Sequence, residues 1–264
     1  QARGVQSRLL GTAPVTRSDT PRVTIVSPHF DDAPLSLGQS LLDGALHGCR
    51  VRVRVVFART NFTRWVHPTR GRAGPISLWR RAEESVAQVA FGYRVATSPH
   101  EEVVLRTGEL DPAVLLDPTS ELDDALVDTL TAQARRWRGD GSTVLFPAGI
   151  GGHLDHRLVA EAGRRLLAEH PDRIGFYEDR PYASLVDPGV VDETLRAIDP
   201  ALVPVDVSGP VTERLHRRLR RCYPSQIDDL FVRAMDADRA TAACERVWFA
   251  PGQVPAWLSF RDGH

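Results

Sequence analysis

The sequence predicts an α/β protein with a Rossmann-like, mostly parallel sheet flanked by helices. Two observations lead to this prediction, and the composition is compatible with it. Strand-like and helix-like segments alternate along most of the chain, and the first of them form a strand, helix, strand unit. The composition, with 42% hydrophobic and 25% charged residues, is that of an ordinary globular protein. Such alternation is typical of parallel strands joined by crossover helices.

The first unit opens the alternation. Residues 22–27 (RVTIVS) are a short β-branched run, and residues 51–57 (VRVRVVF) begin by alternating valine with arginine, so both are predicted strands. Between them, residues 34–47 carry leucines at helical spacing, with Pro34 near the start and Gly48 after the end. We therefore expect neighbouring parallel strands joined by a helix.

The remaining elements show the same two periodicities. Helices are predicted over residues 78–91, 122–137, 157–169 and 211–222, and strands over residues 143–146, 174–177 and 202–207. Two long stretches, residues 61–77 and 106–120, are rich in turn-forming residues and are predicted loops. Loops of this length in a compact domain are usually functional or disordered.

Bulk properties restrict the function. We expect a single domain over residues 21–264, preceded by residues 1–20 as a disordered leader or cloning remnant, because the chain begins at Gln1 rather than methionine. A net charge of -1 offers no basic surface, so nucleic acid is not an expected partner. The three cysteines lie far apart and predict neither a disulfide framework nor a cysteine zinc site. No apolar run has membrane-spanning length, so no membrane partner is expected and the predicted location is the cytoplasm.

A first polar cluster, residues 27–32 (SPHFDD), lies between the first predicted strand and the first predicted helix. Ligands of open parallel sheets bind beyond the carboxyl ends of the strands, so this loop is expected to face a site. His29, Asp31 and Asp32 are then candidate ligands or catalytic groups. Alternatively, the two aspartates only cap the helix.

A second cluster, residues 151–156 (GGHLDH), also lies between a predicted strand and a predicted helix. His153, Asp155 and His156 offer imidazole and carboxylate, and the two glycines permit unusual backbone angles. The alternative is a local hydrogen bond between His153 and Asp155 at a helix start. Two such clusters at equivalent strand ends favour a shared metal site.

The paired loops also resemble a known family. PHFDD followed by GGHLDH is similar to the PHxDD and HxDH loops of the PIG-L/LmbE-like zinc-dependent N-acetylglucosaminyl deacetylases. The resemblance extends to Arg80 and Glu83 (R-x-x-E), to residues 177–182 (YEDRPY) and to residues 223–226 (YPSQ), and it runs from about Pro21 to the C-terminus.

This resemblance implies that His29, Asp32 and His156 are the metal ligands. Three such ligands leave coordination open for water and substrate, as in hydrolytic zinc sites. Zn²⁺ is the expected cofactor, with Fe²⁺, Co²⁺ and Mn²⁺ as alternatives because imidazole and carboxylate do not select strongly among them.

The resemblance also implies catalytic roles. Asp31 is the expected general base, while His153 either stabilises the oxyanion or protonates the leaving nitrogen, with Asp155 holding its tautomer. Two positions depart from the family pattern. Ala33 replaces a frequent glutamate, and Gly151 stands where some members carry a tyrosine that serves the oxyanion, so the oxyanion donor is unassigned.

The implied substrate is an N-acetylated amino sugar, and the resemblance is strongest to deacetylases of teicoplanin-type glycopeptide antibiotics. We therefore expect a small-molecule glycoside or glycopeptide as partner. Arg80, Phe62 and Trp65 are candidate substrate contacts, although the aromatic residues could equally pack within their own loop. Two alternatives stay open: metal-dependent hydrolysis of a phosphoester or another acyl substrate, and a non-catalytic sugar-binding relative.

Overall fold

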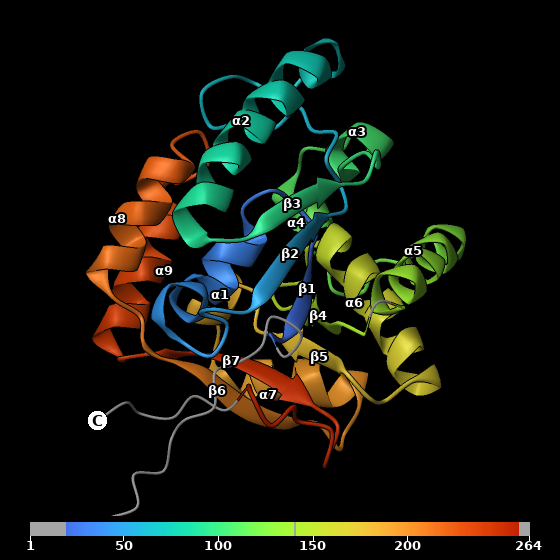
Figure 1. Ribbon diagram of the computed structural model, residues 1–264. Coiled ribbons are helices and arrows are strands. Elements are labelled where there is room, and N and C mark those ends of the chain that lie inside the picture. Colours follow the sequence, from blue (N-terminus) through green and yellow to red (C-terminus); the bar gives the residue numbers. More distant parts are fainter. Residues whose placement is uncertain (1–19, 140, 259–264) are drawn as a thin grey trace, which may run out of the picture.

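The computed structural model describes residues 20–139 and 141–258, so residues 1–19 of the predicted leader lie outside the described part. The strands of the sheet are β1 (Arg22–Ser27), β2 (Arg50–Val55), β3 (Arg94–Thr97), β4 (Thr143–Pro147), β5 (Ile174–Tyr177), β6 (Val203–Pro210) and β7 (Cys244–Phe249). They form one seven-stranded sheet in the order β3-β2-β1-β4-β5-β7-β6 (Figure 1). The first five strands of this order are parallel, and β7 is antiparallel to both of its neighbours. The predicted α/β class with a mostly parallel sheet is confirmed.

Helices cover both faces of the sheet. They are α1 (Asp32–Asp43), α2 (Ala73–Phe91), α3 (Val103–Thr107), α4 (Pro112–Leu115), α5 (Asp124–Arg138), α6 (Leu154–Glu169), α7 (Pro188–Ile198), α8 (Glu213–Cys222) and α9 (Asp229–Ala240), with short 3-10 turns at Arg70–Arg72 and Tyr182–Ser184. Figure 1 shows α1, α2, α8 and α9 on one side of the sheet, and α5 and α6 on the other. No described helix is both long and apolar enough to cross a bilayer.

Alternating strand residues build two cores, one on each face. Ile25 and Leu145 belong to the core that includes residues of α1, α2 and α8. Their neighbours Val26 and Phe146 belong to the core beneath α5 and α6. Successive side chains of a strand point to opposite faces, so a sheet covered on both sides needs apolar residues at nearly every position. This explains the short, continuously apolar strands.

Several boundaries differ from the predicted ones. The strands at residues 22–27 and 174–177 have the predicted bounds, but α1 begins at Asp32 and α2 begins at Ala73, inside a predicted loop. The second predicted loop contains α4. The sequence prediction omitted β3, α3, β7, α7 and α9, whose hydrophobic patterns are short or mixed.

The order of the strands positions the site. The chain moves outward from β1 to β2 and β3 on one side, and from β4 to β5 on the other, so β1 and β4 flank the switch point of the sheet. The two polar clusters follow these two strands. They therefore meet in the crevice where ligands of such sheets normally bind.

Candidate metal centre

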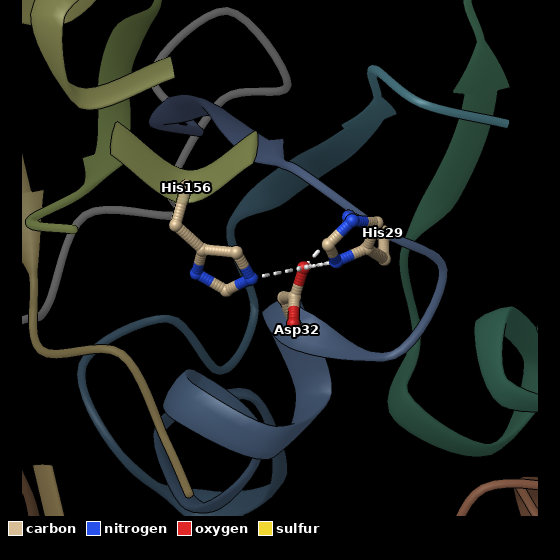
Figure 2. A group of neighbouring side chains, drawn as sticks. All are labelled: His29, Asp32 and His156. Atoms are coloured by element: carbon tan, nitrogen blue, oxygen red, sulfur yellow. Dashed lines mark hydrogen bonds and ion pairs between the residues drawn. The ribbon is translucent and has the colours of Figure 1, made fainter. Parts of the chain in front are cut away.

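Three predicted ligands come together at the switch point. Oδ2 of Asp32 lies 3.3 Å from Nδ1 of His29 and 3.4 Å from Nε2 of His156. Figure 2 shows the Asp32 side chain between the two imidazole rings. The ligand atoms of the three residues all lie within 4.8 Å of one another. Two imidazoles and one carboxylate at this spacing match the ligand set of open hydrolytic metal sites.

A second group overlaps with the first. His29, His153 and Asp155 also offer ligand atoms within 4.8 Å of one another. The two groups share His29, so they compete for one ring rather than forming two independent sites.

Buried carboxylates on the far side of each ring favour the first group. Nε2 of His29 lies 3.0 Å from Oδ2 of Asp155, and Nδ1 of His156 lies 2.7 Å from Oδ1 of Asp179. Metal-binding histidines typically donate their other ring nitrogen to such a carboxylate, which fixes the tautomer. This leaves Nδ1 of His29 and Nε2 of His156, both near Oδ2 of Asp32, as the nitrogen atoms that could bind a metal.

Asp155 corrects one expectation. Its carboxylate contacts His29 and accepts hydrogen bonds from the amide of Val103 (3.0 Å) and from Arg106 (2.7 Å), not from the ring of His153. The contact between the two neighbours is instead the Asp155 amide donating to Nδ1 of His153 at 3.2 Å, which makes His153 the N-cap of α6. His153 and Asp155 therefore do form a local hydrogen bond at a helix start, through the Asp155 backbone amide. The Asp155 carboxylate instead supports His29, a predicted ligand.

Asp31 does not act as a helix cap. It occupies the N-cap position of α1, but its side chain makes no capping hydrogen bond. Its Oδ1 lies 3.1 Å from the Arg80 guanidinium, which also contacts Glu83 at 3.0 Å. Glu83 in turn accepts hydrogen bonds from the amide and hydroxyl of Ser225. The R-x-x-E and YPSQ motifs therefore meet behind the predicted base.

The electrostatics of the centre favour a cation. Burial lowers the pKa of His156, but the carboxylates of Asp32 and Asp179 outweigh this effect and raise it to about 9. Burial likewise opposes, and Asp32 and Asp155 favour, the charged form of His29, whose pKa is raised. Burial, together with His29 and His156, lowers the pKa of His153 to about 3. Positive charge is thus stabilised between His29 and His156, where a metal ion would lie.

The centre opens into a cavity of about 460 Å³. Apolar residues form much of its lining: Phe62, Pro68, Val103, Val104, Leu110, Pro112, Leu115, Leu116, Pro181, Leu230 and Phe231. Glu102, Asp228 and the carboxylates of the centre give it acidic character. A pocket with apolar walls and a few convergent polar groups is typical of a small-molecule site.

The three candidate substrate contacts occupy different places. Phe62 lines the cavity. Arg80 also lines it, but only 2% of the residue is exposed and its guanidinium is held by Asp31 and Glu83. Trp65 lies outside the lining given by the described residues and packs edge-to-face on Trp79, with ring centroids 5.3 Å apart. Trp65 therefore fits the alternative, packing within its own segment, better than a substrate contact.

The two departures from the family motif have structural reasons. Gly151 and Gly152 have φ values of 82° and 78°, the left-handed conformation that their residue type favours. A Cβ at position 152 would lie 2.5 Å from the carbonyl oxygen of Leu116. Ala33 is fully buried, with its amide donating to Ser27, and so belongs to the core rather than to the cavity.

Sequence reasoning gave no role to several residues of the site. Asp179 follows β5 at the same edge of the sheet as the two predicted loops, and this position is the signal that could have identified it. Arg106 and Glu102 come from the segment around α3, where no pattern pointed to the site. Burial raises the pKa of Glu102 to about 7, so the cavity also contains a carboxyl that titrates near neutrality.

Comparison with known proteins identifies the family. No protein-family model matches the sequence. Over 219 residues, covering 80% of this chain and 76% of the relative, the chain is 35% identical to the 2'-N-acetylparomamine deacetylase of Streptomyces fradiae. The chain belongs to the LmbE-like deacetylases. As a member of this family it is a metal-dependent deacetylase, and its His–Asp–His group could hold the metal ion.

Solved structures share the fold of this LmbE-like deacetylase. A deacetylase of the teicoplanin biosynthesis pathway aligns with a TM-score of 0.62 and 21% identity, covering 86% of this chain and 96% of that one. The A40926 pseudoaglycone deacetylase aligns with a TM-score of 0.60 and 22% identity, covering 88% and 97%. A zinc-inhibited form of a teicoplanin deacetylase aligns with a TM-score of 0.61 and 22% identity, covering 86% and 97%.

Proposed function

We propose that this LmbE-like deacetylase is a zinc enzyme that removes the N-acetyl group from an N-acetylglucosaminyl unit of an antibiotic precursor. The observation that carries the proposal is the meeting of His29, Asp32 and His156 at the switch point of the sheet, with Asp31 beside them. The donor set fits zinc, because each imidazole has a carboxylate on its other nitrogen and the third ligand is itself a carboxylate.

Each residue then has a defined task. His29, Asp32 and His156 would hold zinc, which would polarise the amide carbonyl and lower the pKa of the attacking water. Asp31 receives the proton of that water, and its ion pair with Arg80 keeps the carboxylate in one orientation. His153 accepts the Asp155 amide at Nδ1, so Nε2 carries the hydrogen of the neutral ring and can donate a hydrogen bond to the oxyanion. The lowered pKa of His153 disfavours its other expected role, because only an imidazolium can protonate the leaving nitrogen; Asp31 instead returns the proton of the water to that nitrogen. The products are acetate and a free amine.

Two acceptors have support. The apolar walls of the cavity support the glycopeptide acceptor that the sequence predicted, because an aglycone carries aromatic rings. The identity to a deacetylase named for 2'-N-acetylparomamine supports an aminoglycoside precursor, whose amines would suit Glu102 and Asp228 in the lining. The cytoplasm remains the predicted compartment.

Acetate release from a panel of substrates tests the proposal. The panel contains 2'-N-acetylparomamine, an N-acetylglucosaminyl glycopeptide pseudoaglycone and an aryl phosphate. Because one structural neighbour is a zinc-inhibited form, zinc is supplied at one equivalent and then in excess. Acetate release from either amino sugar supports the proposal. Phosphate release alone, or no release from any substrate, refutes it.

Variants of the centre separate binding from chemistry. His156→Ala should lose both zinc and activity, whereas Asp31→Ala should lose activity and keep zinc, because Asp31 is not among the predicted ligands. Asp172→Ala is the matched control, since Asp172 pairs with Arg138 at the surface. A wild-type rate of acetate release in either variant of the centre refutes the assigned roles.

A further inference from the structure

Tyr182 lies beside the centre and is not one of the predicted site residues. It begins the short turn after β5, lines the cavity, and stands edge-to-face on the His156 ring with centroids 5.6 Å apart. The other three tyrosine hydroxyls have acceptors: that of Tyr177 donates to Val26, and those of Tyr93 and Tyr223 donate to Glu84. Within the described part of the chain, the Tyr182 hydroxyl has no hydrogen bond to a protein atom. It is therefore available to a ligand in the cavity.

Gly151 explains the position of this ring. A Cβ at position 151 would lie 2.5 to 2.7 Å from Cβ, Cγ and Cδ1 of Tyr182. Real side chains do not approach so closely, so the tyrosine occupies the space that a side chain at position 151 would need. The near end of Tyr182 is thus packed on the loop that carries His153 and His156, which leaves the hydroxyl end for the cavity.

The same ring stands against a predicted ligand. Nε2 of His156 faces Asp32 in the centre, and the Tyr182 ring packs on the His156 ring at the wall of the cavity. A tyrosine hydroxyl can donate its hydrogen to an acceptor bound there.

We infer that the Tyr182 hydroxyl donates a hydrogen bond to the carbonyl oxygen of the substrate amide and stabilises the negative charge that develops on it. The inference rests on the proposed function and fills the oxyanion position for which Gly151 has no side chain. No bond to Tyr182 forms or breaks, and the hydroxyl keeps its proton throughout. One such donor typically contributes about 10²- to 10³-fold to kcat.

The test compares Tyr182→Phe with the wild type on the amino sugar that releases acetate. We expect kcat to fall by about 10²- to 10³-fold, with KM and zinc affinity within about threefold of wild type, because the lost hydrogen bond forms in the transition state. On the corresponding N-trifluoroacetyl substrate the loss should be smaller, since the fluorines already stabilise the developing charge. Tyr93→Phe is the matched control, because it also removes one tyrosine hydroxyl, which bonds to Glu84 outside the cavity lining, and it should keep kcat.

Each outcome decides the inference. A fall of less than about tenfold in kcat overturns it, as does an equal loss on both acyl groups or a parallel loss of zinc, which would indicate a structural role. A wild-type enzyme that acts while Tyr182→Phe keeps its rate refutes this inference alone. A wild type that releases acetate from no amino sugar refutes the proposed function, and this inference with it.

Discussion

The hydrogen bond between Asp179 and His156 can be tested by substituting the carboxylate. The fully buried Asp179 carboxylate accepts three hydrogen bonds: one from Nδ1 of His156 at 2.7 Å, and two from the amides of Gly149 and Ile150 at 2.8 and 3.1 Å. In Asp179→Asn the single amide oxygen can face the backbone amides or the imidazole, but not both. If it faces the backbone, the amide NH₂ meets Nδ1 and drives the proton of His156 to Nε2, the predicted ligand atom.

Both arrangements weaken the site without changing its volume. Loss of such a supporting carboxylate typically costs about 10- to 100-fold in metal affinity, or about 1.4 to 2.7 kcal/mol. Competition with a chromophoric chelator should therefore show zinc affinity reduced by this factor in Asp179→Asn. Asp172→Asn serves as the control, since it weakens only a surface ion pair with Arg138 and should bind zinc like the wild type. Zinc affinity within threefold of wild type in Asp179→Asn would refute the assignment of the His156 ligand atom.

Three further predictions follow from contacts around the centre. Arg80→Gln should lower kcat about tenfold or more with KM unchanged, because it removes the ion pair that orients the Asp31 carboxylate. Steady-state kinetics checks this, and a rise in KM alone would instead support the substrate contact expected from the sequence. Burial raises the pKa of Glu84 to about 8, above its unfolded value near 4.3, so the stability it contributes is complete below about pH 4 and is lost as pH rises through 8. Urea unfolding should show wild-type stability falling relative to Glu84→Gln between pH 5 and 8, by about 1.4 kcal/mol per pH unit at most, and parallel curves would contradict the shift. Gly152→Ala should lower the free energy of unfolding by about 1 to 3 kcal/mol, whereas Gly74→Ala, in an open helical position with no atom within 4 Å of the new Cβ, should not.

The fold class could be predicted because the early strands repeat a simple pattern. The strand-like segments at residues 22–27 and 174–177 are followed by Pro28 and Glu178, and both strands have the predicted bounds. By contrast, β7 (CERVWF) mixes polar and apolar residues and gains its place by pairing with β5 and β6. Such a strand is defined by tertiary contacts that no local period encodes.

Part of the site could likewise be predicted from the sequence, and part could not. The sequence predicted that the loops carrying His29 and His156 would meet, because both follow strands of one parallel sheet. It did not predict which carboxylate would support which ring. Asp155 is next to His156 in the chain, yet its carboxylate contacts His29, while Asp179, 23 residues after His156, contacts that ring. Contacts of this kind depend on side-chain directions across the crevice, and sequence spacing does not give them.

The segment around α3 contributes both to the wall of the cavity and to the support of a predicted metal ligand. Val103 lines the cavity while its amide, together with Arg106, holds the carboxylate that supports His29. Substitutions that reshape this wall for a new acceptor will also disturb retention of the metal. Leu230 and Phe231 of α9 also line the cavity, but they make no hydrogen bond to the centre among the described residues. New acceptors are therefore more readily accommodated by changes in α9 than by changes in α3.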